Sequence, residues 1–477
     1  MPERISTGVH NLDNVLNGGF PGRYSYLLHG EPGTGKTTFA LQFLLEGVKN
    51  GESVVFVSLS QTRHELEMIA DSHGWDISKI HVVEMKTGEP ETEEQTVFYP
   101  VDIRMDLTRD AIMKALDTHK PRRLVYDSLV EVRKLSRDPT RFQREMLSLK
   151  QTTSEMGVAT LLIDLTTDDS NDLELESYAH GIIHLDKDLP TYGQARRRIE
   201  VAKMRGVDFF DGYHDMDILQ GKGVVAFPRI VPLLAPEEAG GNLISSGVRP
   251  LDEMLGGGLE SGTTALVIGQ AGTGKSTLAS LYLHAALSRG EACAMFLFEE
   301  RQETFFRRSE GLGLPLRSFH KQGLLEIYDF NPSEISQGEF NEIALRSVDE
   351  NNTKVVVIDS FTGYVGGLPN SNEAIVQIQL LLKYLARRDV LTVLIVSQSG
   401  LLGHQMSMTL DVSFLGDTVL FLRMYEAGST IERSITVAKK RHGPHDLNIR
   451  RLEIGKKGVA VLGQTAPETA VRLLGQS

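Results

Sequence analysis

The strongest constraint on the fold of this chain is an internal duplication. Residues 6–13 (Ser-Thr-Gly-Val-His-Asn-Leu-Asp) return as residues 245–252 (Ser-Ser-Gly-Val-Arg-Pro-Leu-Asp), which is a shift of 239 residues. Lys36 and Lys275 lie in two glycine-rich segments and are separated by the same distance. A repeat that keeps its register over this length predicts two homologous domains in tandem.

The segment between the two copies has the composition of a linker. Residues 231–241 contain Pro and Gly and show no hydrophobic periodicity. We therefore predict an N-terminal domain over residues 1–235, a C-terminal domain over residues 236–463 and a short tail over residues 464–477. A chain of 477 residues accommodates two domains of this size within the usual range of domain lengths.

Within each half, short apolar runs alternate with segments of helical periodicity. Residues 24–29 read as a strand, and the apolar residues after the first glycine-rich segment recur on one helical face. Residues 54–57 and 355–358 are the continuous, mostly β-branched runs that are typical of strands buried on both faces. This alternation predicts the α/β class, with a mainly parallel sheet flanked by helices in each domain.

Both glycine-rich segments match the pattern G-x-x-x-x-G-K-[ST], at residues 30–37 and 269–276. Glycines let backbone N–H groups converge on phosphate oxygens, and the helix N-terminus that follows favours negative charge. The pattern predicts that both loops bind ATP, with the lysines on the β- and γ-phosphates and Thr37 and Ser276 on Mg²⁺. The predicted nucleotide contacts are Gly30, Gly33, Thr34, Gly35, Lys36, Thr37 and Thr38, and Gly269, Gly272, Thr273, Gly274, Lys275, Ser276 and Thr277.

A nucleotide site of this kind needs a second carboxylate near the metal, at the end of a buried strand. Asp127 and Asp359 each follow an apolar run and supply one carboxylate to each half. An aspartate in this position also begins many ordinary turns, but beside a phosphate-binding loop that alternative carries little weight. The predicted metal ligands are therefore Thr37, Asp127, Ser276 and Asp359.

The two halves differ in the residues that follow their second strand. The C-terminal half carries Glu299 and Glu300, and a carboxylate there would orient or deprotonate the group that attacks the γ-phosphate. The equivalent residues of the N-terminal half are Ser60 and Gln61, neither of which is a base, although glutamine positions water in some GTPases. Glutamates are also common in the first turn of a helix. We predict catalysis by Glu299 and Glu300 in the C-terminal half, and slow or absent hydrolysis in the N-terminal half.

A Lys-x-Arg pair recurs late in each half, as Lys203 with Arg205 and as Lys439 with Arg441. Side chains two residues apart on a strand point to the same face, so each pair would present two cations to phosphate. Solvated surface charge is the alternative, and the recurrence of the pair near the same place in both copies weakens it.

Composition narrows the classes of protein to consider. The formal net charge is −13 and the isoelectric point is near 5.6, which disfavours a surface built for nucleic acid. Cys293 is the only cysteine, so no intrachain disulfide and no cysteine-based metal site can form. We see no signal-peptide core and no run of about 18 apolar residues, so we expect a cytoplasmic protein without a membrane span.

These features together resemble the KaiC family of tandem RecA-like ATPases over about residues 3–463. The resemblance implies a double-ring homohexamer with ATP bound between neighbouring subunits. It further implies that Lys203, Arg205, Lys439 and Arg441 act on the nucleotide of the adjacent subunit, and that His445 lies near a nucleotide. The resemblance is carried by Ser-Thr-Gly-Val at 6–9, Ser-Ser-Gly-Val at 245–248, Leu-Asp-Glu-Met at 251–254, three glycines at 256–258, Phe-Glu-Glu at 298–300 and the two Lys-x-Arg strands.

The chain departs from the family pattern in three places. The paired glutamates are absent from the N-terminal half, and its counterpart of His445 is Phe209. The family's adjacent autophosphorylated Ser and Thr fall, counting back from Asp417, on Ser413 and Phe414, and a phenyl ring accepts no phosphate. The tail after Gly463 is short, so a partner that grips a longer extension would find little here. The family is typified by a cyanobacterial clock protein. Because of these departures, we expect a KaiC-like signalling ATPase rather than a clock oscillator.

The sequence is compatible with three classes of function. The leading hypothesis is a hexameric ATP-driven switch with protein partners and with Ser autokinase activity at Ser413. A DNA-acting motor of RecA or helicase type is the alternative, although no basic segment interleaved with aromatic residues is present. A nucleotide-assembled scaffold with negligible turnover is a third class. For His445, metal binding together with His442 is a weaker alternative to a nucleotide contact, because no further residue with the spacing of a metal ligand lies nearby in the sequence.

Overall fold

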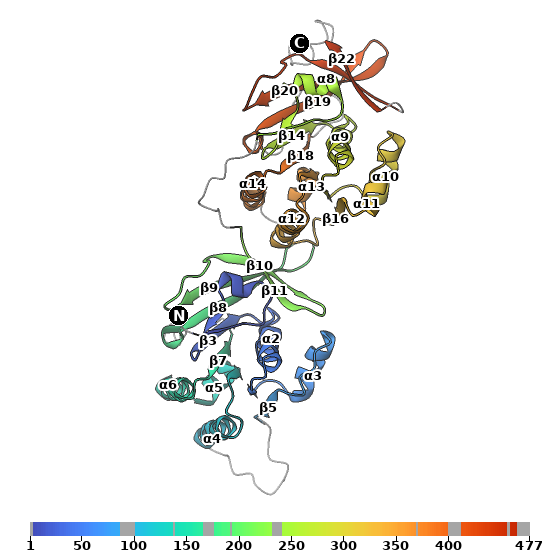
Figure 1. Ribbon diagram of the computed structural model, residues 1–477. Coiled ribbons are helices and arrows are strands. Elements are labelled where there is room, and N and C mark those ends of the chain that lie inside the picture. Colours follow the sequence, from blue (N-terminus) through green and yellow to red (C-terminus); the bar gives the residue numbers. More distant parts are fainter. Residues whose placement is uncertain are drawn as a thin grey trace. The chain divides into compact units, whose positions relative to one another are not determined.

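The chain forms two compact units, Met1–Arg229 and Ile230–Ser477 (Figure 1). The structure, a computed structural model, describes residues 3–85, 101–136, 139–165, 176–190, 193–230, 241–368, 371–398, 412–455 and 458–464. The predicted boundary between residues 235 and 236 lies outside these residues, as does the predicted tail beyond residue 464. In the described ranges, no helix is long and apolar enough to cross a membrane.

The first unit is built on one sheet that has nine strands in the described residues, in the order β11-β10-β9-β8-β3-β7-β6-β4-β5. The strands from β8 to β5 run parallel, and β9 to β11 add an antiparallel extension. The strands are β3 (Ser25–Gly30), β4 (Val54–Ser58), β5 (His81–Glu84), β6 (Arg123–Asp127), β7 (Ala159–Asp164), β8 (Gly181–Asp188), β9 (Arg196–Met204), β10 (Tyr213–Leu219) and β11 (Gly223–Phe227).

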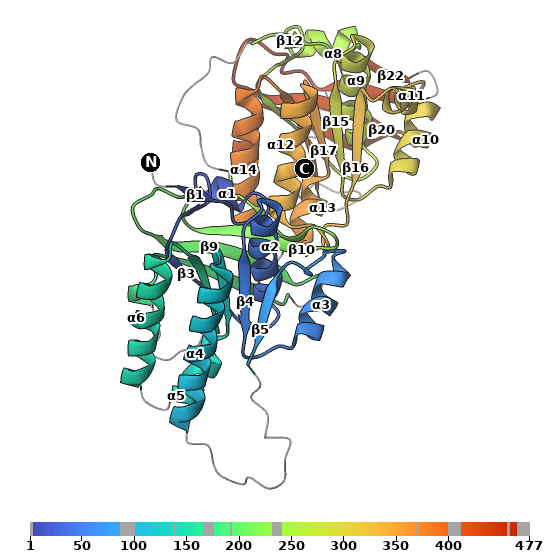
Figure 2. The same cartoon turned by 60° about the horizontal axis from the view of Figure 1, so that its bottom comes forward.

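Helices cover both faces of this sheet, and a small ribbon of β1 (Arg4–Ile5) and β2 (Phe20–Pro21) precedes it. Successive residues of β3 point to opposite faces. Tyr26 and Leu28 pack in the cluster that contains α2 and α3, whereas Leu27 packs in the cluster that contains α4, α5 and α6 (Figure 2). The helices are α1 (Leu12–Val15), α2 (Lys36–Lys49), α3 (Arg63–Ser72), α4 (Val101–His119), α5 (Leu129–Ser136) and α6 (Pro139–Glu155).

The second unit repeats this plan, again with nine strands in its described residues, in the order β16-β15-β17-β18-β14-β19-β20-β21-β22. The strands from β16 to β19 are parallel, and β20 to β22 are antiparallel. They are β14 (Thr264–Gly269), β15 (Cys293–Leu297), β16 (Leu325–Asp329), β17 (Val355–Asp359), β18 (Leu391–Ser397), β19 (Thr418–Ala427), β20 (Thr430–Lys440), β21 (Arg450–Gly455) and β22 (Gly458–Gln464), with a ribbon of β12 (Leu243–Ile244) and β13 (Leu259–Glu260).

Two helical layers enclose the second sheet as well. One hydrophobic cluster contains residues of α8 to α11, and the other contains residues of α12 to α14 (Figures 1 and 2). The helices are α8 (Arg249–Met254), α9 (Lys275–Ser288), α10 (Gln302–Gly311), α11 (Leu316–Lys321), α12 (Gln337–Asn351), α13 (Phe361–Gly366) and α14 (Ser371–Arg387), and η1 (Ser413–Leu415) is a 3₁₀ turn.

The prediction of two α/β domains with mainly parallel sheets is confirmed. The central strands β3, β4, β14 and β17 are buried at every position, as their apolar runs indicate. The antiparallel extensions were not predicted from the sequence. β9 and β10 mix buried and half-exposed residues, whereas β11 is buried throughout.

Candidate functional site

The two glycine-rich loops join the central strand of each sheet to the helix that follows it. The first loop leaves β3 at Gly30 and enters α2 at Lys36, and the second runs in the same way from β14 to α9. Gly33 and Gly35 have φ values of 81° and 106°, and Gly272 and Gly274 have values of 79° and 103°. Residues with side chains rarely adopt these angles, so the glycines are required for the shape of the loop.

Packing against the neighbouring strand explains the first glycine of each loop. A Cβ atom on Gly30 would lie 2.6 Å from the carbonyl oxygen of Leu185 in β8. On Gly269 it would overlap the carbonyl oxygen of Leu422 in β19. The buried hydroxyls of Thr34 and Thr273 close each loop by donating to the backbone carbonyls three residues earlier, at 2.9 and 2.8 Å. Both loops are therefore shaped by the same contacts.

The lysine of each loop folds over the loop backbone. Lys36 Nζ donates to the carbonyl oxygens of Gly30 and Glu31 at 2.5 and 2.8 Å, and Lys275 Nζ donates to that of Gln270 at 2.9 Å. Burial lowers the pKa of both lysines, and nearby carboxylates oppose this shift. Each ammonium group thus lies inside its loop, where phosphate oxygens would replace the carbonyl partners.

The aspartates predicted as metal ligands end the strands two places away from the loop strands. Asp127 ends β6 and Asp359 ends β17, and their exposed fractions are 5% and 7%. Burial raises the pKa of Asp127 to about 6, against the opposing charge of Lys36, and burial also raises the pKa of Asp359. Asp127 accepts a hydrogen bond from Ser60, and Asp359 accepts one from Ser276.

These oxygen atoms fit a magnesium ion. Oδ2 of Asp359 is buried and has no hydrogen-bond partner in the described part of the chain, while Ser276 bonds to the same carboxylate. A hydroxyl and a carboxylate are the hard oxygen donors that Mg²⁺ prefers beside nucleotide phosphates. Thr37 occupies the position of Ser276 in the first unit, at the start of α2. Thr38 and Thr277 follow in the first helical turn and are almost fully buried.

The residues after β15 lie against the end of β17 in the second unit. Phe298 N donates to the carbonyl oxygen of Asp359 at 2.8 Å, which draws Glu299 and Glu300 to this edge of the sheet. Glu299 Oε1 accepts a hydrogen bond of 2.6 Å from the hydroxyl of Ser360. The charge of Glu299 also opposes the lowering of the Lys275 pKa, which indicates that this carboxylate lies close to the loop lysine.

The first unit has the same backbone connection without the carboxylates. Leu59 N donates to the carbonyl oxygen of Asp127 at 2.6 Å, so Ser60 and Gln61 occupy the corresponding place. Gln61 bonds through its backbone to Ser58, whose hydroxyl donates to the Gln61 carbonyl oxygen at 2.6 Å and accepts from its N–H at 3.0 Å. This site therefore offers hydroxyl and amide groups where the second unit offers two acids.

Lys203 and Arg205 lie at the far end of the first sheet from the loop. Both side chains donate to backbone carbonyls of the segment before β8, at 2.6 and 2.8 Å. In the register of the sheet, this end of β9 is level with Tyr26 near the start of β3, whereas the loop begins at Gly30. At about 3.3 Å per residue, the backbone at this end of β9 is separated from Gly30 by about 13 Å along the strand direction.

Lys439 and Arg441 occupy the corresponding end of the second sheet. Lys439 Nζ donates to the carbonyl oxygens of Ser413 and Gly416 at 3.2 and 2.8 Å, and Arg441 pairs with Asp417 at 3.1 Å. This end of β20 is level with the start of β14. The structure thus brings each Lys-x-Arg pair together, but not with the loop of its own unit.

The predicted role of His445 is not tested by any contact. His445 is half-buried between β20 and β21, and its counterpart Phe209 packs against the core of the first unit. No group of three or more His, Cys, Asp or Glu side chains with the spacing of a metal site occurs within the described ranges, so nothing there supports metal binding by His442 and His445.

Two ion pairs near these sites were not anticipated from the sequence. Asp164 at the end of β7 is fully buried, pairs with Arg133 at 2.7 Å and opposes the lowering of the Lys36 pKa. An aspartate after an apolar run is the signal that would have drawn attention to it. In the second unit, Arg308 of α10 pairs with Glu300, and nothing in the sequence pattern alone points to that contact.

Comparisons with known proteins agree with the duplicated geometry. The sequence profile of the family described as "ATPase: KaiC" matches residues 5–230 and again residues 244–466. The chain is 27% identical to the circadian clock protein KaiC3 of Synechocystis sp. over 96% of its length and 92% of that protein. It is 26% identical to the circadian clock oscillator protein KaiC of Thermostichus vulcanus, over 96% and 89%. The same oscillator protein of Synechococcus elongatus is 27% identical, over 95% and 88%.

Both matched segments contain one complete glycine-rich loop with its strand, its helix and its buried aspartate. The chain belongs to the KaiC family of ATPases.

Proposed function

We propose that the chain binds ATP in both units and hydrolyses it mainly in the C-terminal one. The observation that carries this proposal is the difference between two sites of the same backbone design. Glu299 and Glu300 stand beside the loop and Asp359 in the second unit, and Ser60 and Gln61 stand in their place in the first. Membership of an ATPase family supports ATP as the ligand.

Each residue of the second site would have a separate role in hydrolysis. Lys275 would neutralise charge on the phosphates, and Ser276 and Asp359 would hold Mg²⁺. The metal, when bound, would neutralise negative charge on the phosphates. Glu299 would orient the attacking water and accept its proton, because its carboxylate is held by Ser360 near the loop lysine.

The first unit has the parts for binding without a base. Its loop, Lys36 and Asp127 repeat those of the second unit, so ATP would be held there with similar contacts. Gln61 could position water but would not remove its proton. Slow turnover in this unit suits a role in assembly, in which bound ATP joins neighbouring subunits.

The position of the Lys-x-Arg pairs supports a ring assembly. Each pair extends from backbone about 13 Å from its own loop along the strands, and both lysines bond to backbone carbonyls at that end of the sheet, away from the loop. A homohexameric double ring would bring Lys203, Arg205, Lys439 and Arg441 to the nucleotide of the adjacent subunit. The mass of the particle with and without ATP tests this point, and a monomer in both conditions would refute it.

The same geometry supports a second activity, phosphoryl transfer to Ser413. Lys439 Nζ lies 3.2 Å from the carbonyl oxygen of Ser413, so the residue sits beside the cations that would meet a neighbour's ATP. The serine oxygen would attack the γ-phosphorus, its proton would pass to a glutamate of the neighbour and ADP would leave. Phosphopeptide mapping after incubation with ATP tests this proposal, and an unmodified Ser413 peptide would contradict it.

Signalling through protein partners is favoured over action on DNA. The best basic run, residues 196–198, lies in β9, where its register partners in β8 and β10 include Asp186, Asp188 and Asp215. Arg197 also pairs with Asp217 at 3.1 Å. These carboxylates neutralise the run. A DNA-binding assay at low salt should show no binding, and binding that weakens steeply with salt would support the motor instead.

Steady-state phosphate release tests the division between the two units. The Glu299→Gln/Glu300→Gln variant should lose at least about a hundredfold in turnover, because it removes the general base. The equivalent change in the other unit, Ser60→Ala/Gln61→Ala, should change turnover less than about twofold. Equal losses in the two variants would refute the asymmetry, and an unchanged Glu299→Gln/Glu300→Gln variant would refute the assigned catalytic pair.

A further inference from the structure

Glu299 and Glu300 are adjacent in sequence but have different partners. Glu299 accepts a hydrogen bond from the neutral hydroxyl of Ser360. Glu300 instead forms a two-point ion pair with Arg308, whose Nη2 and Nε lie 2.7 and 3.2 Å from its two carboxylate oxygens. A bidentate guanidinium–carboxylate pair fixes the orientation of both groups more strictly than a single contact does. The two glutamates are therefore held by different means.

The guanidinium of Arg308 is itself well held. It lies over the ring of the fully buried Phe305, with 5.4 Å between its central carbon and the ring centroid. The side chains of Arg308 and Glu300 are 26% and 23% exposed, so the pair is largely shielded from water. Nη1 is buried and has no hydrogen-bond partner in the described residues. An arginine in such a setting differs from the many surface arginines, whose ion pairs contribute little.

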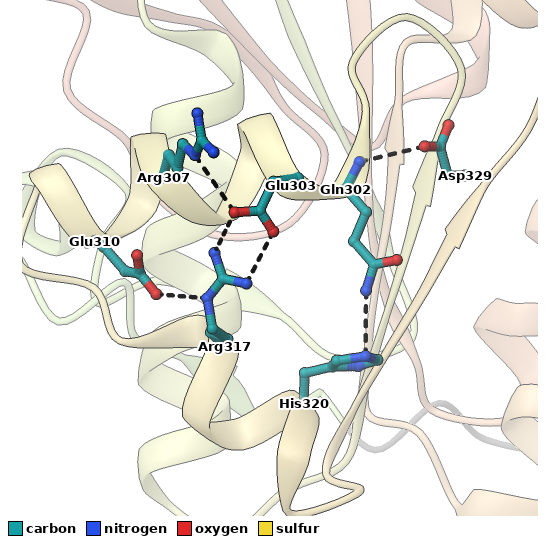
Figure 3. Close-up of polar contacts among 7 residues, drawn as sticks. All are labelled: Gln302, Glu303, Arg307, Glu310, Arg317, His320 and Asp329. Atoms are coloured by element: carbon teal, nitrogen blue, oxygen red, sulfur yellow. Dashed lines mark hydrogen bonds and ion pairs between the residues drawn. The ribbon is translucent and has the colours of Figure 1, made fainter.

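The helix that carries Arg308 is anchored to its surroundings by a polar network (Figure 3). Arg317 of α11 bonds to both carboxylate oxygens of Glu303, at 2.9 and 3.0 Å, and to Glu310 at 2.8 Å. At the start of the helix, Gln302 bonds through its backbone N–H to Asp329 and through its side chain to His320. These contacts join α10 to α11 and β16. Arg308 thus projects from an element whose position is fixed at both ends.

The first unit lacks the whole arrangement, not only the acids. Helix α3 corresponds to α10 at the repeat distance, and on it the place of Arg308 is taken by Ile69, which packs against the core. Where Glu300 becomes Gln61, the arginine therefore becomes an aliphatic residue. The acid and its cation are present together in one unit and absent together from the other.

We propose that Arg308 is a positioning residue that fixes Glu300 and thereby leaves Glu299 as the base for ATP hydrolysis. The inference rests on the proposed function, because it assigns separate roles within the proposed catalytic pair. Two like charges at adjacent residues would otherwise compete for the same place beside the loop. Arg308 binds one of them through both oxygens, so only the carboxylate of Glu299 is available to the attacking water. The charge of Arg308 also acts on Asp359, lowering its pKa against the effect of burial.

A double-mutant cycle tests this role in the full-length protein. We expect Glu299→Gln to lower kcat for ATP by a hundredfold or more. Arg308→Met should lower it by about tenfold because it releases the Glu300 carboxylate to compete with Glu299, and Glu300→Gln by about tenfold because it leaves the Arg308 guanidinium without its carboxylate partner beside Glu299. The KM for ATP should change less than about twofold, because Arg308 does not contact the nucleotide. The double variant Glu300→Gln/Arg308→Met should be no slower than Glu300→Gln alone. Arg308→Lys keeps the charge and should recover part of the loss.

Arg307→Met is the matched control. Arg307 is the preceding residue of α10, its side chain is 78% exposed, and its partner is Glu303 rather than Glu300. Its turnover should equal that of the wild type. Thermal unfolding of every variant checks that it is folded. If Arg308→Met is unfolded, Arg308→Lys replaces it in the double-mutant cycle.

The possible results distinguish the positioning role of Arg308 from the proposed hydrolysis of ATP. Losses that multiply in the double variant would show that Arg308 acts independently of Glu300 and would overturn its positioning role. A raised KM with unchanged kcat in Arg308→Met would overturn it too, since the arginine would then be a nucleotide contact. Equal losses in Glu299→Gln and Glu300→Gln would refute the separate roles while leaving the proposed hydrolysis intact. A wild type without turnover would overturn the proposed function, and the role of Arg308 with it.

Discussion

Replacing Asp127 by asparagine should stabilise the ligand-free N-terminal unit. Burial raises the pKa of this carboxyl to about 6, which means that the folded unit penalises its ionised form. In the unfolded chain the same group titrates near 3.9. Asparagine has nearly the same shape and no charge to bury, so Asp127→Asn removes the penalty while keeping the packing.

The sign and size of the effect follow from the two pKa values. Between about pH 4 and pH 6 the folded state holds a proton that the unfolded state has released, so the free energy of unfolding falls as the pH rises. The difference of about 2 pKa units amounts to about 3 kcal/mol, which is fully present above pH 6. Asp127→Asn should therefore gain about 3 kcal/mol over the wild type at pH 8 and roughly half of that at pH 5.

The sole tryptophan of the chain, Trp75, provides a readout confined to the N-terminal unit. Its ring stacks on His73, with centroids 4.5 Å apart, and lies against Gly223. Urea unfolding followed by tryptophan fluorescence at pH 5 and pH 8 gives the two free energies of unfolding. Asp359→Asn is the matched control, because it makes the same change in the other unit and should leave the Trp75 transition in place.

Addition of Mg²⁺ and ATP should reverse the order of stability. A ligand present at a thousand times its dissociation constant stabilises the folded state by about 4.1 kcal/mol, which exceeds the penalty of about 3 kcal/mol, and Asp127→Asn would forgo most of this gain. The reasoning is refuted if Asp127→Asn is less stable than the wild type at pH 8 without ligand. It is also refuted if the difference in free energy of unfolding between Asp127→Asn and the wild type is the same at pH 5 and pH 8.

Two further substitutions test the structure on either side of the duplication. Arg123→Met should lower the free energy of unfolding of the N-terminal unit by about 3–5 kcal/mol. The reason is that the buried guanidinium pairs with Glu52 at 2.5 Å and bonds to two backbone carbonyls. An unshifted Trp75 unfolding transition would contradict this. Gly274→Ala should lower the free energy of unfolding of the C-terminal unit by about 1–3 kcal/mol and abolish nucleotide binding there. The reason is that φ at this residue is 103° and the new Cβ would overlap Ile454. Titration with a fluorescent ATP analogue should then show one site per chain instead of two.

The sequence predicted those parts of the molecule that depend on local pattern. The loops at Gly30 and Gly269 were recognisable because a phosphate cradle needs glycine at fixed spacings, and the structure shows positive φ angles within them. The strand that contains Val355 was recognisable because a strand buried on both faces is apolar throughout. The antiparallel strands β9 and β10 were harder to assign, because their mixture of buried and half-exposed residues resembles many surface strands.

The parts that the sequence did not predict depend on how elements turn relative to one another. Arg308 and Glu300 are eight residues apart, and their contact exists only because α10 begins at Gln302 and brings its second turn back over the end of β15. Asp164 ends an apolar run as Asp127 does, but its partner Arg133 comes from a helix 31 residues earlier. No spacing rule connects such pairs.

Nucleotide analysis of a protein with only one working loop tests the asymmetry of the two sites most directly. Lys275→Met disables the C-terminal loop and leaves the N-terminal loop intact. After incubation of this variant with ATP and Mg²⁺, we predict about one nucleotide per chain, recovered as ATP, and phosphate release lowered at least about a hundredfold. Recovery of ADP, with phosphate release at the wild-type rate, would show that the N-terminal unit hydrolyses ATP and would contradict the proposed division between the two units.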